Sequence, residues 1–387
     1  MDYWFYFLHK SIELIKSEGV VSFVTSRYWV NSKGAKKLIK HISDTSKFIN
    51  IVDIGDLIVF DNVVGHHMIS ILQKSKKEKN CLYLKLSENV NKIVNSDFDE
   101  IRKISSSEII SKDYEILLEK RISLNTTTTL DDFYNVSQGI VEASDKISKK
   151  MYKNNPDPKH FVGEGIFVLS KEETEHLNLS TEEKSILEIY EDSGCINRYF
   201  IDYSKTRNLI YSDKVNREKI KNEKNFSVLR KHLDSMQGYI TSSFKPYGLH
   251  RSRNYEDFVQ PKLIGPSMFE VPCFSFDNRK LFVGMSYNII TSKGNSDLFY
   301  ILGLLNSSFG KKWFYDNAKH RGVGVDVGVE KLRQFPIPNS SQTQQQDIIS
   351  CVNSILKARA NLKYDEVNKI ETELDSKVYS LYGLISK

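Results

Sequence analysis

The chain has 387 residues, of which 40% are hydrophobic and 27% charged, and its formal net charge is +6. This length predicts two or three domains, each with its own core, and the composition is that of an ordinary globular protein. No apolar run approaches the roughly 20 residues that a membrane helix needs. The N-terminal segment carries charges where a signal peptide requires an uninterrupted apolar centre. We therefore expect a soluble, cytoplasmic protein.

The four cysteines indicate isolated thiols in a reducing compartment. They lie far apart, at Cys81, Cys195, Cys273 and Cys351, and form no Cys-x-x-Cys pair. No histidine stands near them at a ligand spacing, so no zinc site is expected. The sequence also contains no nucleophile elbow, metal triad or kinase-type set, and no catalytic residue is predicted.

The first 75 residues predict part of an α/β sheet. Apolar positions at helical spacing predict a helix over residues 3–16, capped by Asp2 and ended by Gly19. The apolar stripe of this helix consists of Trp4, Phe7, Leu8, Ile12 and Ile15. Strands are predicted over residues 20–25, 48–54 and 68–73, with a basic helix over residues 33–42. The first strand has the composition of one buried on both faces, and strand–helix–strand order predicts parallel pairing. Because no strand precedes the first helix, we expect this sheet to be incomplete.

The remainder divides at Asn125–Thr129, a polar segment that predicts a linker. Residues 82–86, before it, could form an edge strand. Beyond it a mixed α+β region is expected, with strands near residues 136–141, 166–169, 209–211, 262–264 and 281–290 and a helix over residues 298–305. Pro336 and Pro338 end this region. Two apolar stripes in residues 342–387 predict a helical hairpin that breaks near Leu362.

A basic stretch runs from His250 to Asn339. Between residues 241 and 340 there are 13 Lys+Arg and 8 Asp+Glu, a difference of +5 out of a total of +6. Such a surface suits a polyanion, although a domain with an ordinary solvated basic face would have the same composition. The glycine-rich residues 322–328 lack the context of a dinucleotide or P-loop motif. They are interpreted either as a loop that meets phosphates through its amides, Lys319 and Arg321, or as a plain surface loop.

Several motifs resemble the second half of a DNA adenine-N6 methyltransferase domain of the gamma class, which includes TaqI-like enzymes and type IIG restriction-modification proteins. The motifs are Asp2-Tyr3-Trp4-x-x-Phe7, the run from Gly19 to Trp29, Gly34-Ala35-Lys36-Lys37-Leu38, Ile54-Gly55-Asp56, Val59-Phe60-Asp61 and Met68-Ile69-Ser70-Ile71-Leu72. The stretch from His250 to Asn339, with Leu305-Asn306-Ser307 and Phe335-Pro336-Ile337-Pro338, resembles a TaqI-like C-terminal specificity domain. Residues 379–384 resemble the terminal helix that follows many such domains.

The resemblance implies a Rossmann-like methyltransferase sheet, double-stranded DNA as partner and S-adenosylmethionine as cofactor of the intact enzyme. The glycine loop that binds this cofactor and the Pro-Pro motif that holds the flipped adenine are absent from the sequence. None of the eight prolines is adjacent to another. We therefore expect that this chain binds no S-adenosylmethionine and cannot methylate alone. Tyr28 or Trp29 could form one wall for a flipped base, or both could pack in the core.

The sequence thus predicts three parts: residues 1–125 as the C-terminal half of a methyltransferase domain, residues 126–341 as a target-recognition domain, and residues 342–387 as a helical hairpin. The expected function is DNA target recognition within an adenine-N6 methyltransferase or restriction-modification enzyme, completed by an upstream methyltransferase half. A stand-alone specificity subunit that serves separate methyltransferase or nuclease subunits is the alternative. Candidate DNA contacts are Lys245, Arg251, Arg253, Tyr255, Lys311, Lys312, Lys319 and Arg321.

Overall fold

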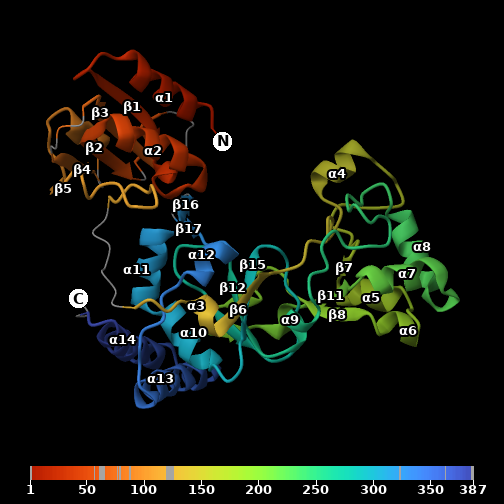
Figure 1. Cartoon of the computed structure of the whole chain (residues 1–387). Coiled ribbons are helices and arrows are strands. Elements are labelled where there is room, and N and C mark those ends of the chain that lie inside the picture. Colours follow the sequence, from red (N-terminus) through yellow and green to blue (C-terminus); the bar gives the residue numbers. More distant parts are fainter. Residues whose placement is uncertain are drawn as a thin grey trace. The chain divides into compact units, whose positions relative to one another are not determined.

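The computed structural model describes residues 2–55, 57–60, 66–75, 77, 80–86, 89–118, 126–321, 324–361 and 363–384 (Figure 1). The motif residues Asp56 and Asp61, the hairpin break at Leu362, and Asn125, Gly322 and Val323 lie outside this range. The chain forms two compact units. The first contains residues 1–124, 268–270 and 312–327, and the second contains residues 125–267, 271–311 and 328–387. The fold is mixed α/β, with several separate sheets.

A five-stranded sheet forms the centre of the first unit, in the order β1-β3-β2-β4-β5. Its elements are α1 (Trp4–Leu14), β1 (Val20–Ser26), α2 (Lys36–Thr45), β2 (Lys47–Gly55), β3 (His67–Gln73), β4 (Cys81–Lys85) and β5 (Glu100–Ile104). β3 runs antiparallel to both β1 and β2, and only β2 and β4 pair in parallel. The expected parallel pairing of the first two strands is wrong because β3 inserts between them. β4 is an inner strand rather than the expected edge, since β5 pairs with it.

The core of this unit forms on one side of α1 and β1. Phe5, Leu8 and Ile12 of α1 are buried with Trp29 and Phe48, whereas Phe7, expected in the buried stripe, is 67% exposed. β1 is one of the two edge strands. Its odd-numbered residues are partly or fully buried and alternate with even-numbered residues that are more exposed, so β1 is not buried on both faces. The predicted capping of α1 by Asp2 is wrong. The N-cap residue is Tyr3, which makes no side-chain hydrogen bond, and Asp2 accepts from the Phe5 amide only through its backbone carbonyl oxygen.

The second unit contains a four-stranded sheet, β14-β12-β15-β6, and a three-stranded sheet, β7-β11-β8. Their strands are β6 (Tyr134–Gln138), β7 (Val168–Leu169), β8 (Leu187–Tyr190), β11 (Arg207–Ile210), β12 (Lys262–Pro266), β14 (Ser275–Asp277) and β15 (Tyr287–Ser292), and a small pair is formed by β9 (Ile196–Asn197) and β10 (Phe200–Ile201). The predicted strands near residues 136–141, 166–169, 209–211 and 262–264 are confirmed with shifted ends. The strand predicted over residues 281–290 is confirmed only from Tyr287, where β15 begins.

Short helices surround these sheets. They are α3 (Leu130–Phe133), α4 (Lys149–Asn154), α5 (Lys171–His176), α6 (Thr181–Lys184), α7 (Lys214–Asn222), α8 (Ser227–Ser235), α9 (Glu256–Val259) and α12 (Val329–Arg333). Within this unit, α4 to α8 gather around β7, β8 and β11, away from α13 and α14 (Figure 1). Serine or aspartate side chains cap α4, α5, α6 and α7, which satisfies amides that the first turn leaves without partners.

The predicted C-terminal helices are present as α13 (Gln342–Ala360) and α14 (Tyr364–Leu381), and they pack on each other and on α10 (Leu298–Asn306). Gly303 makes this approach possible. A Cβ atom there would lie 2.6 Å from Ile348 Cγ2 and 3.1 Å from Val352 Cγ2 of α13. No helix among the described residues is long and apolar enough to cross a membrane.

A three-stranded sheet completes the first unit with segments from late in the sequence. It consists of β13 (Met268–Phe269), β17 (Gly324–Asp326) and β16 (Lys319–Arg321), in that order and all antiparallel. Residues 312–317 belong to the C-terminal part of α11 (Ser308–Asn317). The sequence predicts all these residues as parts of the target-recognition domain, because local patterns do not reveal packing against residues before 125.

Candidate nucleic-acid interface

A buried polar cluster fixes β16 in the first unit. Arg27 Nε lies 2.9 Å from Asp53 Oδ2, and both side chains are largely buried. The same Asp53 oxygen accepts a hydrogen bond from the Tyr83 hydroxyl at 2.9 Å. His320 of β16 faces this cluster, with its Nε2 3.3 Å from an Arg27 terminal nitrogen and its ring centroid 5.1 Å from that of His66. Burial, together with Arg27 and His66, lowers the pKa of His320 to about 4.

Tyr28 and Trp29 lie in a 3₁₀ helix, Arg27–Asn31, directly after β1. Trp29 is fully buried and packs edge-on against Trp4, with 5.4 Å between the ring centroids. Tyr28 is only partly buried, and the ammonium of Lys319 lies 5.4 Å from the centre of its ring. Of the two aromatics considered as a wall for a flipped base, only Tyr28 reaches the surface.

The cations of α11 and β16 in the first unit are exposed but partly neutralised. Lys312 pairs with Asp316 at 2.9 Å, and Arg321 Nε lies 3.5 Å from Asp326 Oδ2. Lys319 has no carboxylate partner among the described residues and contacts Tyr28 instead. Of these three cations, Lys319 is therefore the one whose charge is not paired with a carboxylate and can bind an added anion, beside the Tyr28 ring.

Arg251 and Arg253 of the second unit differ in what their side chains contact. Arg253 donates from Nε to the Gly139 carbonyl oxygen at 3.1 Å and from a terminal nitrogen to Gln138 Oε1 at 2.9 Å. Burial and the neighbouring Arg251 lower its pKa. Arg251 is exposed, and its backbone pairs with Val141 through two hydrogen bonds of 2.9 and 3.0 Å. The backbone of Arg251 is thus fixed while its guanidinium faces solvent.

The remaining candidates of the second unit, Tyr255, Lys245 and Lys311, are all exposed. Tyr255 packs beside Tyr211 and Phe282, and its hydroxyl donates to Glu188 Oε1 at 2.8 Å. Burial and Glu188 raise the pKa of Tyr255 to about 12. Its ring is therefore held in an aromatic cluster and only partly available to a ligand.

A cavity of about 540 Å³ lies between the start of α7 and residues 244–253. Its lining includes the predicted Arg251 and Arg253 together with two cations that were not predicted from the sequence, Lys214 and Arg217. The guanidinium of Arg217 lies 5.0 Å from the centre of the Phe244 ring, which is 48% exposed. Arg217 and Phe244 stand 27 positions apart in sequence, so no local pattern could have joined them.

A second cavity of the unit, of about 350 Å³, is acidic and unsuited to phosphate. Its lining includes Glu142, Asp145, Glu191 and Asp192, with Lys146 as one of its cations. Burial raises the pKa of Glu191 to about 7. Among the residues that the structure describes, no group of three or more His, Cys, Asp or Glu side chains is placed to hold a metal ion.

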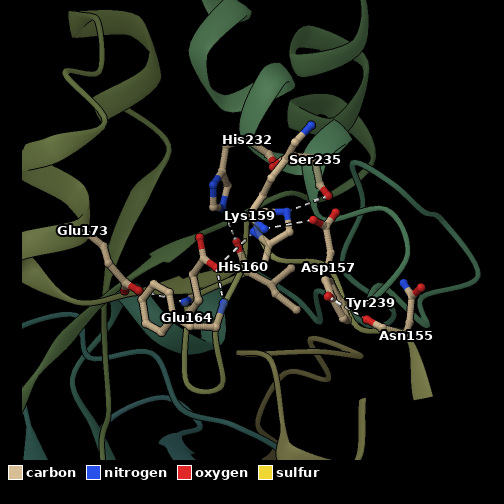
Figure 2. A network of polar contacts seen from close by, with 12 residues as sticks. Asn155, Asp157, Lys159, His160, Glu164, Glu173, His232, Ser235 and Tyr239 are labelled. Atoms are coloured by element: carbon tan, nitrogen blue, oxygen red, sulfur yellow. Dashed lines mark hydrogen bonds and ion pairs between the residues drawn. The ribbon is translucent and has the colours of Figure 1, made fainter. Parts of the chain in front are cut away.

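Figure 2 shows a third polar network, centred on His160. Its Nδ1 lies 3.0 Å from Glu164 Oε2, and its Nε2 lies 3.1 Å from the carbonyl oxygen of Ser235 at the end of α8. The nearby His232 contacts the Ile166 carbonyl oxygen through its Nε2 at 3.0 Å. Both ring nitrogens of His160 are occupied, so this network connects the loop after α4 to α8 and offers no site for chemistry.

Two family models match parts of the chain. Residues 1–60 match the family model of the Eco57I restriction-modification methylase, and residues 188–337 match that of the TaqI-like C-terminal specificity domain. The second match contains Arg251, Arg253, Tyr255 and the cavity beside α7.

Among full-length relatives, the Type II methyltransferase M.MjaIV of Methanocaldococcus jannaschii is 22% identical over 219 residues, which cover 54% of this chain and 72% of the relative. The Type II restriction enzyme and methyltransferase RM.Eco57I of Escherichia coli is 22% identical over 382 residues, covering 91% of this chain and 38% of the relative. This chain therefore spans well under half of RM.Eco57I.

A solved structure of the Type IIL restriction-modification enzyme MmeI in complex with DNA has a similar fold. Its TM-score is 0.68 at 15% identity, and the match covers 99% of this chain and 49% of that one. The chain is therefore related to restriction-modification methylases, with a methylase region in residues 1–60 and a TaqI-like C-terminal specificity region in residues 188–337.

Proposed function

We propose that this chain supplies DNA target recognition for a site-specific adenine-N6 DNA methyltransferase of a restriction-modification system in the cytoplasm. The observation that carries the proposal is the match of residues 188–337 to a TaqI-like C-terminal specificity domain. Lys245, Arg251 and Lys311 of the second unit are exposed and support it, because exposed lysine and arginine side chains provide the electrostatic part of DNA binding.

Arg251 is the preferred base or phosphate contact of the second unit. Its guanidinium is exposed, whereas that of Arg253 is already bonded to Gln138 and Gly139. Arg251→Ala should therefore weaken duplex binding without changing stability. Arg253→Ala should lower the free energy of unfolding by about 1–3 kcal/mol, because it leaves two acceptors without their donor.

In the first unit, the proposed contacts are Lys312, Lys319 and Arg321, with Tyr28 as the aromatic wall for a flipped adenine. Lys319 above the Tyr28 ring supports this assignment, because a cation beside an exposed ring suits both the phosphate and the base of one nucleotide. The fully buried Trp29 is better explained as a core residue.

We further propose that the first unit docks on a methyltransferase segment that carries the S-adenosylmethionine loop and the Pro-Pro motif. Large apolar side chains on α1 and β1 face solvent and support such an interface: Tyr3, Tyr6, Phe7, Leu14, Val20 and Val24. β1 is also an edge strand of its sheet. An exposed edge beside apolar side chains promotes association with another chain or segment.

The test of target recognition is selection from a pool of degenerate DNA duplexes by the full chain, followed by sequencing of the retained DNA. One enriched sequence is expected, and its affinity should fall with rising salt. Retention of all sequences alike would refute target recognition.

The test of the docking proposal is a methyl-transfer assay. The chain alone should not transfer a methyl group, and addition of a segment with the cofactor loop and the Pro-Pro motif should restore transfer to the selected site. Calorimetry with S-adenosylmethionine provides the second measurement. Saturable binding to the chain alone would show that its cofactor site has been wrongly assigned.

A further inference from the structure

The cavity between α7 and residues 244–253 is a rigid, concave and basic site. Two hydrogen bonds connect its walls: the Ser212 hydroxyl donates to the Tyr247 carbonyl oxygen, and the Leu249 amide donates to the Ser212 carbonyl oxygen at 3.1 Å. Two backbone hydrogen bonds between Arg251 and Val141 also fix the lining segment near its end. The cavity is therefore built by the fold rather than by loose surface side chains.

Gly248 allows Arg217 and Phe244 to meet at the cavity wall. A Cβ atom at Gly248 would lie 2.7 Å from Phe244 Cβ and 2.8 Å from Arg217 Cδ, closer than side chains normally approach. The guanidinium of Arg217 lies above the Phe244 ring, and its Nε forms an ion pair with Glu218 Oε1 at 3.4 Å, where the Glu218 side chain is exposed. These two contacts orient Arg217, and the terminal nitrogens of its guanidinium are the donors considered for a ligand.

Four cations from two segments line this cavity, namely Lys214, Arg217, Arg251 and Arg253. Arg253 is already bonded to Gln138 and Gly139, so the first three are the ones considered for a ligand. Among the residues that the structure describes, the side chains of Lys214 and Arg251 have no hydrogen-bonding or ion-pairing partner. The carboxylate in the lining, Asp213, accepts from the Asn216 amide at 2.8 Å as the N-cap of α7. The lining thus has four cations and one carboxylate, and this excess of positive charge fits an anion.

We propose that this cavity holds a phosphate of the DNA backbone between Lys214, Arg217 and Arg251, with Phe244 against the adjoining sugar. The inference rests on the proposed function and adds residues to it. A concave site accepts a group that projects from the duplex, which phosphates do, whereas base edges lie at the floor of a groove. The contact positions the chain on DNA and does not read sequence.

The experiment measures the affinity of the full chain and its variants for several unrelated duplexes, at salt concentrations from about 50 to about 200 mM. Lys214→Ala and Arg217→Ala should each weaken binding roughly tenfold to all duplexes alike. Each should also reduce the slope of log affinity against log salt by about one unit. Phe244→Leu should weaken binding with an unchanged salt slope, because it removes an uncharged contact.

The matched control is Lys231→Ala, which removes an exposed lysine from α8 outside the cavity. It should leave affinity and salt slope within error, and circular dichroism should show every variant folded. A loss confined to one base-pair position, or an unchanged salt slope for Lys214→Ala and Arg217→Ala, would overturn the phosphate assignment while target recognition remained. A wild-type chain that binds no duplex would refute the proposed function and this inference together.

Discussion

The ion pair of Lys262 and Asp277 offers a quantitative test of the core of the second unit. Both side chains are fully buried, and the two residues are direct partners across β12 and β14. Lys262 Nζ lies 2.5 Å from Asp277 Oδ2 and also donates to the Phe258 carbonyl oxygen. Asp277 accepts in addition from the Tyr203 hydroxyl at 2.6 Å and from two backbone amides of the following turn, each at 3.0 Å.

These contacts predict an order of effects. Lys262→Met leaves the carboxylate with three donors but without its cation, so the free energy of unfolding should fall by about 3 kcal/mol, the lower end for a broken buried pair. Asp277→Leu leaves a buried ammonium and three unpaired donors, so the loss should reach about 5 kcal/mol or more. The double variant removes the stranded charge but keeps the unpaired donors, and its stability should lie between those of the two single variants.

Urea unfolding followed by circular dichroism measures these losses, with Lys231→Met as the exposed-lysine control. Tryptophan fluorescence provides a second readout, since all three tryptophans, Trp4, Trp29 and Trp313, belong to the first unit. The Lys262 variants should therefore shift the circular dichroism transition more than the fluorescence transition. A Lys262→Met variant within about 1 kcal/mol of the wild type would refute the buried-pair argument.

Three further predictions concern packing and pH. Trp29→Ala should lower the free energy of unfolding by about 3–5 kcal/mol in urea titrations, as for other buried aromatics, whereas an unchanged stability would favour the base-wall role. Lowering the pH from about 7 to about 5 should cost about 2 kcal/mol through His320, because its folded pKa of about 4 is depressed, so the unfolded chain binds the proton first. His320→Gln should flatten that dependence, and an equally steep profile would exclude His320 as its source. Gly303→Leu should destabilise the chain by about 1–3 kcal/mol in thermal melts, because the side chain would collide with α13, and an unchanged melting temperature would contradict that packing.

Local patterns predicted the elements well. The two terminal helices, β2, β3 and β12 follow from apolar periodicity, which depends on residues within one segment. The pattern could not predict that β3 inserts between β1 and β2, because strand order is decided by contacts distant in sequence. From the sequence, Lys262 is indistinguishable from the other lysines of the basic stretch. The structure buries it in the core, where it pairs with Asp277 on the neighbouring strand.

The candidate site was predicted only in part, for the same reason. Arg251 and Lys319, two of the predicted DNA contacts, are exposed. They could be proposed from the sequence because an excess of basic residues is visible in composition. The engagement of Arg253 by Gln138 depends on a segment more than 100 residues earlier. Lys214 and Arg217 were missed because they reach the site from a helix that precedes the basic stretch.

The three strands β13, β16 and β17 affect how specificity could be exchanged between relatives. A chimaera that replaced everything after residue 126 would also replace His320, which lies against Arg27, and the strands around it. Strands β16 and β17 from the donor protein would then pack against the recipient's counterparts of Arg27 and Asp53. The transferable portion is instead discontinuous: a graft should keep the host's residues 268–270 and 312–327 and exchange the segments between and around them.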